Sequence, residues 1–294
     1  GLSRVFFVNS GSEANENALR IALQSTGRSN IIAVEHSFHG RTGAAAAVTW
    51  GAKTSWYGFP HTPFNVTFVP RNDIAALKTA INNDTAGVII EPVQGVAGAF
   101  DFSKEFLTTA RALCDQHSAM LILDEVQTGV GRLGTPFGAD LFGVTPDLLT
   151  TAKALGGGVP CAALLMTDSL AADLRPGALG STFGGAPLAC AAIKTVLEVI
   201  EEDNLLTRVQ NIGDLIRDKC VFGPIVGVQG AGFLIGLKTK PQAVQVRDTL
   251  LRSGILTGTS ADPHVLRLLP PFILEEQHVT LLLRALQEFK SETF

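Results

Sequence analysis

The sequence predicts an α/β protein in which a mostly parallel sheet has helices on both faces and is followed by a smaller α+β domain. Short, evenly apolar strand-like runs alternate with helical runs through the first part of the 294-residue chain. Such strands are typical of parallel sheets that are buried on both faces. The pattern then changes to longer helices and glycine-rich strands. We therefore predict a large domain over residues 1–193 and a small domain over residues 194–294.

The elements of the large domain are predicted from their apolar patterns, in chain order. Apolar runs bounded by polar residues or glycine predict strands, which cover residues 4–8, 30–35, 86–93, 119–126, 146–153 and 161–168. Apolar residues at helical spacing predict helices over residues 12–27 and 103–118. Because ligands of parallel sheets bind at the carboxyl ends of the strands, polar residues that follow these strands are the first candidates for a site.

The small domain is predicted to mix helices with short strands. An apolar helical run opens with "PLACAAIKTVL" and leads into a long helix. The predicted elements are that long helix through residues 204–220, two strands around glycines within 225–239, a helix over 242–254, a strand over 264–270 and a helix over 275–292. This succession is typical of a compact α+β domain.

The composition excludes several classes of function. The chain has 27 acidic and 23 basic residues, and this mild acidity argues against a nucleic-acid or membrane-surface protein, because both need a basic face. No apolar run reaches the ~18–20 residues of a membrane span. No basic, apolar secretion signal opens the chain, so we expect a cytoplasmic protein. The four cysteines form no CxxC pair and are expected to be reduced core residues.

A carboxylate at the end of a buried strand is the first candidate site residue. The run "MLILDEV" places Asp124 and Glu125 directly after apolar strand residues. An unpaired charge that leaves water is costly. We therefore expect Asp124 to face a positive partner at the carboxyl edge of the sheet.

The segment "VNSGSEANENAL" is a second candidate, because it places Ser10, Gly11 and Ser12 between a strand and a helix. Ser10 and Glu13 fit the capping box S-x-x-E, which any helix can use. The free N–H groups and the dipole of such a helix end also form a site for phosphate. These residues alone leave both interpretations open.

A third candidate, Lys153, follows an apolar strand and precedes three glycines in "TTAKALGGG". In such a setting a lysine is often only a solvated side chain. Its small neighbours leave room for a planar ligand, however, and a lysine can then form a Schiff base. A lysine, a phosphate cradle and a strand-end carboxylate are the three groups that hold pyridoxal phosphate, and Asp124 would then pair with the protonated ring nitrogen.

Six stretches carry a family resemblance. In chain order they are "NSGSEANENAL", "HSFHGRT", "EPVQG", "LILDEVQTGVGRLG", "PDLLTTAKALGGGVP" and "GSTFGGAPLA". With them the chain resembles the class III, fold-type-I pyridoxal-phosphate aminotransferases, above all the acetylornithine and ornithine branch. The resemblance covers most of the chain. It implies an aspartate-aminotransferase-like fold and pyridoxal 5′-phosphate as the cofactor.

The resemblance also implies roles for single residues around the cofactor ring. Lys153 is expected to form the Schiff base and to move the proton during transfer, while Asp124 binds the pyridine nitrogen. Gln127 is expected to bind the ring hydroxyl. Phe38 and Val126 are expected to cover the two faces of the ring.

The phosphate and the subunit boundary involve further residues of the same motifs. Gly11 and Ser12 are expected to bind the phosphate, and Thr182 is expected to reach the phosphate of the neighbouring subunit's cofactor in a homodimer. The remaining residues expected near the cofactor are Ser10, His39, Glu91 and Ser181. His36 and His39 form an HxxH pair, but no third ligand is spaced to complete a metal site, so no metal is expected.

Arg41 and Arg267 are the two candidates for binding substrate carboxylates, because arginine offers a planar, two-pronged donor. Each could instead be a structural ion-pair partner. Ornithine-type relatives carry a glutamate after "EPVQG" that pairs with the pocket arginine, where this chain has Val96. The resemblance therefore implies an unmasked Arg267 and a more apolar pocket. Relatives usually begin roughly a hundred residues earlier, and we expect the chain to lack that N-terminal segment.

The resemblance implies an aminotransferase that moves an amino group from an ornithine-like, acetylornithine-like or other ω-amine to a keto acid such as 2-oxoglutarate or pyruvate. The reaction would pass through the pyridoxamine form of the cofactor and accept a broad range of S-amines. Two alternatives stay open from the sequence. One is an aminomutase or decarboxylase on the same scaffold, and the other is a truncated relative that binds the cofactor but is inactive.

Overall fold

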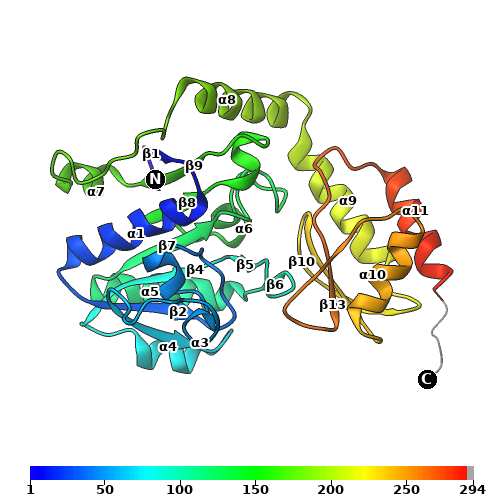
Figure 1. Cartoon of the computed structure of the whole chain (residues 1–294), viewed down its shortest axis with the longest axis horizontal. Coiled ribbons are helices and arrows are strands. Elements are labelled where there is room, and N and C mark those ends of the chain that lie inside the picture. Colours follow the sequence, from blue (N-terminus) through cyan, green and yellow to red (C-terminus); the bar gives the residue numbers. More distant parts are fainter. Residues whose placement is uncertain (290–294) are drawn as a thin grey trace. The chain divides into compact units, whose positions relative to one another are not determined.

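The computed structural model describes residues 1–289, and the contacts within it divide the chain into two compact units (Figure 1). The first unit consists of Gly1–Pro92, Phe102–Val130 and Phe137–Glu198. The second consists of Val93–Asp101, Gly131–Pro136 and the chain from Val199 onward. The boundary predicted between residues 193 and 194 stays a prediction, and it falls within helix α8 (Pro187–Glu202).

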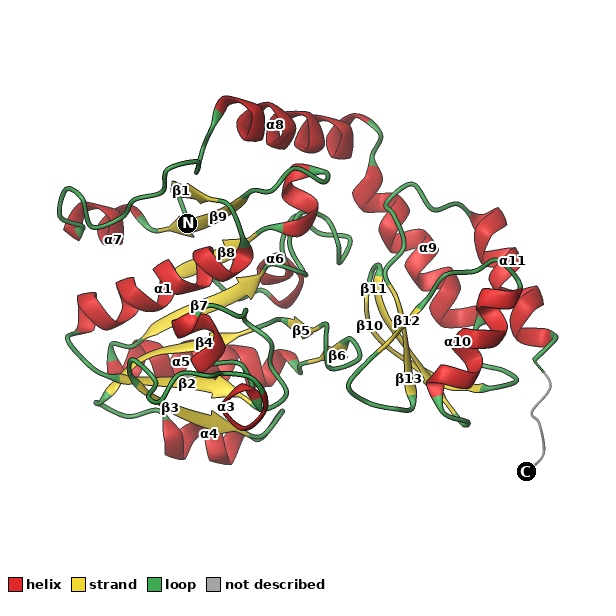
Figure 2. Cartoon of the chain, in the orientation of Figure 1, coloured by secondary structure: helices red, strands yellow, loops and turns green. Residues whose placement is uncertain are grey.

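The first unit is built on a seven-stranded sheet with the strand order β1-β9-β8-β7-β4-β2-β3 (Figure 2). Its strands are β1 (Arg4–Val8), β2 (Asn30–Val34), β3 (Asn65–Val69), β4 (Thr85–Ile90), β7 (Met120–Glu125), β8 (Leu148–Thr151) and β9 (Ala162–Met166). Strand β9 pairs antiparallel with both β1 and β8. Hence β1 runs in the same direction as β8, β7, β4, β2 and β3, which pair in parallel. The predicted, mostly parallel sheet is confirmed.

Helices pack against this sheet. They are α1 (Gly11–Thr26), α2 (Gly43–Ala47), α3 (Ala52–Ser55), α4 (Ile74–Ala80), α5 (Lys104–His117), α6 (Gly138–Phe142), α7 (Asp168–Asp173) and the 3-10 helix η1 (Lys153–Gly156). Helix α1 contacts β8, β9 and β4, while α5 contacts β7 and β4. Fully buried strand residues such as Ile31, Ile89 and Ile122 meet Leu19 and Ile21 of α1 in one core. The continuous apolar strand runs are thus explained by burial.

Helix α1 begins where its sequence predicts. The Ser10 hydroxyl accepts a hydrogen bond from the Glu13 N–H at 3.3 Å, and the Glu13 carboxylate accepts one from the Asn9 N–H at 3.0 Å. These contacts satisfy free N–H groups at the helix start. At the other end Gly27 takes a left-handed conformation with φ 68°, which glycine adopts without strain. The predicted cap by Ser10 is confirmed, whereas the Glu13 carboxylate accepts from the Asn9 N–H instead of the Ser10 N–H that a capping box requires.

The second unit contains a four-stranded antiparallel sheet in the order β10-β11-β13-β12. Its strands are β10 (Ile225–Ala231), β11 (Leu234–Thr239), β12 (Gly258–Thr259) and β13 (Val265–Leu268), with the small pair β5 (Val93–Gln94) and β6 (Phe100–Asp101). Its helices after α8 are α9 (Leu205–Lys219), α10 (Ala243–Arg252) and α11 (Glu276–Gln287). Apolar residues of the sheet and of these helices form its core.

Some features depart from the sequence pattern. The predicted helical run is interrupted between α8 and α9 at Asn204, whose φ of 51° lies in the left-handed region. Strand β3 and helix α4, between β2 and β4, have no counterpart among the predicted elements. The last predicted helix is observed as α11, and residues 290–292 of that prediction lie outside the described residues. Within residues 1–289, every helix is too short or too polar to cross a bilayer.

Candidate functional site

One edge of the seven-stranded sheet collects the predicted site residues of the first unit. Because β1, β2, β4, β7 and β8 run in the same direction, their carboxyl ends lie at this edge. The segments that follow these strands carry Ser10–Ser12, His36–Thr42, Glu91, Gln127 and Lys153. Asp124 is the next-to-last residue of β7. The sheet thus brings together residues that are far apart in the sequence, at the edge where such folds bind ligands.

Asp124 is buried, with 3% of its surface exposed. Its Oδ2 accepts a hydrogen bond from Asn15 Nδ2 at 2.7 Å and lies 2.7 Å from His39 Nδ1. Its Oδ1 accepts one from the Val126 N–H at 3.0 Å. Three donors therefore offset much of the cost of burying the carboxylate. Within the protein, the nearest ring nitrogen to this carboxylate is Nδ1 of His39.

His39 and Glu91 extend this buried polar group. His39 is 2% exposed, and its Nε2 has no hydrogen-bond partner among residues 1–289. Glu91 is 6% exposed, and its Oε1 accepts the Phe38 N–H at 2.9 Å. Burial raises the pKa of Glu91 to about 7, with a smaller raising effect from Asp124 and an opposing effect from His39. Glu91 can therefore hold or release a proton near neutral pH.

Lys153 lies at the first position of η1, directly after β8. Its φ is 46°, a left-handed conformation that costs a non-glycine residue of order 1–3 kcal/mol. The side chain is exposed, and its charge lowers the pKa of Glu91, against the larger effect of burial. The preceding Ala152 is buried in a small apolar cluster against which Val126 packs. The Lys153 amine therefore lies close enough to Glu91 for its charge to act on that acid.

The start of α1 is closely packed. A Cβ on Gly11 would lie 2.6 Å from Val126 Cγ2, so only glycine fits there without displacing Val126. The hydroxyl of Ser12 accepts hydrogen bonds from the Arg41 and Thr42 N–H groups, each at 3.2 Å. The Ser12 side chain therefore holds the loop that carries Arg41. The N–H groups of this first turn have no partner within the helix, which suits an anion.

The other predicted cofactor residues differ in their surroundings. Phe38, Val126 and Gln127 are half-buried around the ends of β2 and β7. Ser181 is half-buried, and its hydroxyl accepts hydrogen bonds from Asn9 Nδ2 at 3.3 Å and the Gly184 N–H at 3.0 Å. Thr182 is exposed. Ser181 is thereby connected to the segment before α1.

The two candidate arginines lie in different units. Arg41 is exposed, and its guanidinium stacks on the Trp56 ring at 4.7 Å from the centroid. Arg267, in the second unit, donates from Nε to the Thr259 carbonyl at 2.8 Å and from Nη1 to the Gly95 carbonyl at 3.1 Å. Burial lowers the pKa of Arg267. Among residues 1–289, neither arginine has a carboxylate within ion-pair distance, which leaves both able to bind an anion.

Two polar residues of the site were missed by sequence reasoning. Asn15 is 1% exposed and binds Asp124, and Thr150 is fully buried and donates to Asn15 Oδ1 at 2.7 Å. The only signal was the place of Asn15 in "SGSEANENAL", one turn beyond the cap. Nothing in the local pattern marks Thr150 as more than a strand residue.

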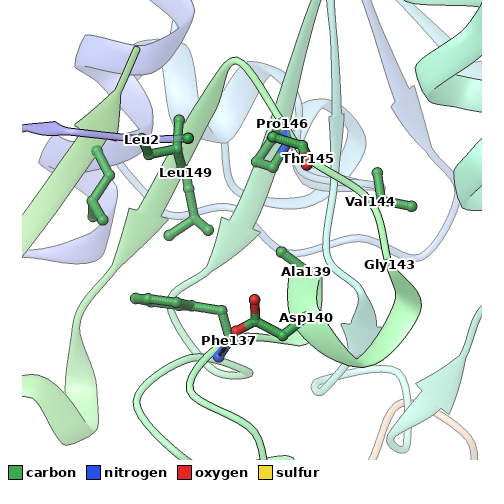
Figure 3. A pocket seen from close by; sticks show the side chains of 11 residues that line it. Leu2, Phe137, Ala139, Asp140, Gly143, Val144, Thr145, Pro146 and Leu149 are labelled. Carbon is green, nitrogen blue, oxygen red and sulfur yellow. Dashed lines mark hydrogen bonds between the residues drawn. The ribbon is translucent and has the colours of Figure 1, made fainter. Parts of the chain in front are cut away.

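A separate cavity of about 550 Å³ lies in the first unit, and none of the predicted site residues lines it (Figure 3). Its walls include Phe137 and Asp140 near the start of α6, Leu149 of β8, and Leu2. Among residues 1–289, no group of His, Cys, Asp and Glu side chains could hold a metal ion.

Comparison with known proteins gives concordant matches. The family described as aminotransferase class-III matches residues 1–289. The acetylornithine aminotransferase of Methanocaldococcus jannaschii is 40% identical, over 99% of this chain and 76% of its own length. The ornithine aminotransferase structure from Toxoplasma gondii ME49 superposes with a TM-score of 0.90 at 29% identity, covering 98% of this chain and 73% of that one. An S-selective transaminase structure from Arthrobacter sp. gives 0.88 at 27%, covering 97% and 74%.

Proposed function

This chain belongs to the class III aminotransferases, which are pyridoxal-phosphate enzymes of fold type I, and from that premise we propose its substrates and the roles of its residues. The proposed reaction moves an amino group from an ornithine-like, acetylornithine-like or other ω-amine to a keto acid such as 2-oxoglutarate or pyruvate. The observation that carries this proposal is the register of β7 and β8, which pairs Asp124 with Thr150 and so brings Lys153 to the same sheet edge.

The residues at this edge fit the cofactor. Asp124 offers a buried carboxylate for the protonated ring nitrogen, and Lys153 offers an amine for the aldehyde. The start of α1 offers N–H groups for the phosphate, and Gly11 leaves room for Val126 to pack against this helix end. Val126 packs beside Gly11 and Ala152, which suits a residue that covers one ring face.

Four further assignments follow from the family motifs and from the positions of the residues. We assign Phe38 to the other ring face, Gln127 to the ring hydroxyl, and His39 and Glu91 to the polar wall behind the ring. Both Phe38 and Gln127 are half-buried, as ring-contacting residues should be, while His39 and Glu91 are buried. Ser181 is connected to the start of α1 through Asn9, which suits a place near the phosphate.

When bound, pyridoxal phosphate supplies an electron-withdrawing ring that stabilises negative charge at the substrate carbon. The protein supplies the rest. Lys153 holds the cofactor at rest and then moves a proton at the substrate carbon through its freed Nζ. Asp124 keeps the ring nitrogen protonated. Glu91, with a pKa raised to about 7 by burial, adjusts the charge of the site near neutral pH.

The two arginines are proposed to bind substrate carboxylates. Arg267 keeps its guanidinium half-buried on two backbone carbonyls, and a buried cation favours an anionic partner. The Arg41 guanidinium lies over the Trp56 ring, 4.7 Å from its centroid, and this contact holds the cation at the surface. Val96, where ornithine-type relatives carry a glutamate, leaves Arg267 unmasked. We therefore propose a broad range of S-amines as donors, in keeping with the S-selective transaminase among the similar structures.

A homodimer is proposed as the working form, with Thr182 reaching the cofactor of the neighbouring subunit. Thr182 is exposed, and beside it Phe183 and Leu188 are 70% and 72% exposed. Along α8, Leu197 and Val199 are also exposed. Apolar side chains that gather in this way are typical of an interface. Size measurement by light scattering tests this assignment, and a monomer that retains full activity would contradict it.

The test of the proposed function is an absorbance titration. The purified chain is saturated with pyridoxal phosphate and then mixed with single amines, including ornithine, acetylornithine and S-1-phenylethylamine. We expect the band of the lysine-bound cofactor to convert to the band of its amino form, and a keto acid to restore it. A cofactor band that forms but never converts with any amine would contradict transamination. Loss of carbon dioxide without transfer to an acceptor would instead indicate a decarboxylase.

A further inference from the structure

A buried side-chain amide lies behind Asp124. Asn15, in the second turn of α1, is 1% exposed. Its Nδ2 donates to Asp124 Oδ2 at 2.7 Å and to the His39 carbonyl at 2.8 Å. Both N–H groups of the amide are therefore used, and both point to the residues that hold the cofactor side of the sheet edge.

The oxygen of this amide is held by Thr150. The Thr150 hydroxyl donates to Asn15 Oδ1 at 2.7 Å. A reversed amide would place its oxygen against the Asp124 carboxylate and the His39 carbonyl, both of which can only accept. These two acceptors therefore select the orientation in which Asn15 donates to Asp124, and the Thr150 hydroxyl, which can donate, holds the amide oxygen in place. Thr150 also pairs directly with Asp124 across β7 and β8, so the three groups share one rigid frame.

The hydrogen bonds of Asp124 leave a defined vacant direction. An ionised carboxylate accepts about four hydrogen bonds. Oδ2 is occupied by Asn15 and His39, whereas Oδ1 accepts only the Val126 N–H among residues 1–289. The remaining acceptor position is therefore on Oδ1. Because Asn15 fixes Oδ2, it also fixes the direction in which Oδ1 can meet a cationic N–H.

We propose that Asn15 is a positioning residue that orients the Asp124 carboxylate toward the cofactor's ring nitrogen, and that Thr150 supports it by holding the Asn15 amide oxygen. The inference rests on the proposed role of Asp124. In this role Asn15 acts on the ring nitrogen through Asp124, while its second hydrogen bond, to the His39 carbonyl, holds the segment that follows β2. The hydrogen bond from Asn15 strengthens the contact between the Asp124 carboxylate and the cofactor's ring N–H. The contacts of the cofactor with the start of α1 and with Lys153 stay unchanged.

Because the proposed effect is limited to the contact with the ring nitrogen, it can be distinguished experimentally from a merely structural role. Two probes are used, pyridoxal phosphate and its 1-deaza analogue, in which carbon replaces the ring nitrogen. Their dissociation constants are measured by equilibrium dialysis with the cofactor-free protein. The quantity of interest is the ratio of the two constants, analogue over cofactor, because it isolates the contact with the ring nitrogen.

The variants are Asn15→Ala, Thr150→Val and Thr150→Ser. We expect Asn15→Ala to lower the ratio about tenfold, the loss that corresponds to one hydrogen bond to a charged group. Thr150→Val keeps the side-chain shape but loses the hydroxyl, and it should lower the ratio about threefold. Thr150→Ser restores the hydroxyl and should restore the ratio. If Asn15→Ala fails to fold, the two Thr150 variants carry the test.

A matched control is Thr239→Val in the second unit. Thr239 is 4% exposed, and its hydroxyl donates to the Pro241 carbonyl at 2.7 Å, so the change removes a similar buried hydrogen bond. The ratio should stay at its wild-type value there. Equal weakening of both probes in Asn15→Ala and Thr150→Val would overturn the positioning role and leave only packing. Failure of the wild-type chain to bind pyridoxal phosphate would overturn the proposed function itself. This outcome is distinct from a changed ratio, which is seen only in the variants.

Discussion

Asp124 and Glu125 are neighbouring carboxylates at the end of β7, and each is buried and accepts three hydrogen bonds. Strand alternation sends their side chains to opposite faces of the sheet. Asp124 receives donors from distant segments, Asn15 and His39, with one from the nearby Val126 N–H. Glu125 receives the Thr128 hydroxyl and two N–H groups at the start of α6.

The difference shows that burial alone does not identify a functional acid. Glu125 fastens the loop that follows β7 onto the first turn of α6, whose N–H groups lower its pKa against the larger raising effect of burial. The charges of Asp124 and Lys153 both act on Glu91, and Val126, two residues beyond Asp124, packs against Gly11. The partners of each carboxylate, and the side of the strand on which it lies, therefore separate chemistry from architecture. Substitutions at Lys153, Asp124 and Glu125 test this separation.

The largest effect is expected from Lys153→Ala, on the Asp124 side. Turnover should fall below detection and the absorbance band of the lysine-bound cofactor should vanish, because the amine that holds the aldehyde and moves the proton is gone. Lys78→Ala, an exposed lysine of α4, is the matched control and should keep both. Normal turnover in Lys153→Ala would remove the assignment of the site.

Asp124→Asn should lower turnover on the order of a hundredfold or more while the protein stays folded, because a neutral amide cannot stabilise a cationic ring nitrogen. Glu125→Gln, its neighbour, should keep turnover per folded molecule within about threefold of the wild type. Rates are measured with the cofactor at saturation and corrected for the folded fraction. Equal losses of turnover in the two variants would contradict the proposed difference in role between Asp124 and Glu125.

Arg267→Ala should weaken keto-acid acceptors on the order of ten- to a hundredfold in kcat/KM, and neutral aldehydes far less, because only the former carry a carboxylate to bind. Arg41→Ala gives the companion measurement on the first unit. The same acceptor pair is used for both variants. Equal loss with both acceptor types would exclude Arg267 from carboxylate binding.

The smallest effect concerns stability and pH at Glu125. Burial raises the pKa of Glu125 to about 7 from its ordinary value of 4.5, so the folded state holds a proton that the unfolded state releases. This contribution to stability is present below pH 4.5 and is lost as pH rises through about 7. Glu125→Gln lacks this titration.

Urea unfolding at pH 5 should therefore find the Gln variant less stable by about 1–3 kcal/mol, because an acceptor for the α6 N–H groups is lost. The difference in the free energy of unfolding between the wild type and this variant should be smaller at pH 8. A gap that widens with pH would show that Glu125 is stabilised as a carboxylate instead. Thr128 and the N–H groups of Gly138 and Ala139 would then outweigh burial.

The sequence predicted the strands that build the site because those strands are buried on both faces and read as continuous apolar runs, as in β4 and β7. Strand β3 was missed because its residues alternate between exposed and half-buried along most of its length, which interrupts the apolar run. Asp124 and Lys153 were predictable because each follows such a run directly. Asn15 and Thr150 were not, because the bond between them joins residues 135 positions apart.

The left-handed backbone of Lys153 has a consequence for engineering this protein. At φ 46° a glycine would be free of the strain that any other residue bears, so Lys153→Gly is expected to raise the melting temperature while it removes the reactive amine. A screen that rewards thermal stability alone would therefore select against the side chain that we propose as the attachment point of the cofactor. Selection for stability in this scaffold has to be coupled to a readout of transamination at every round.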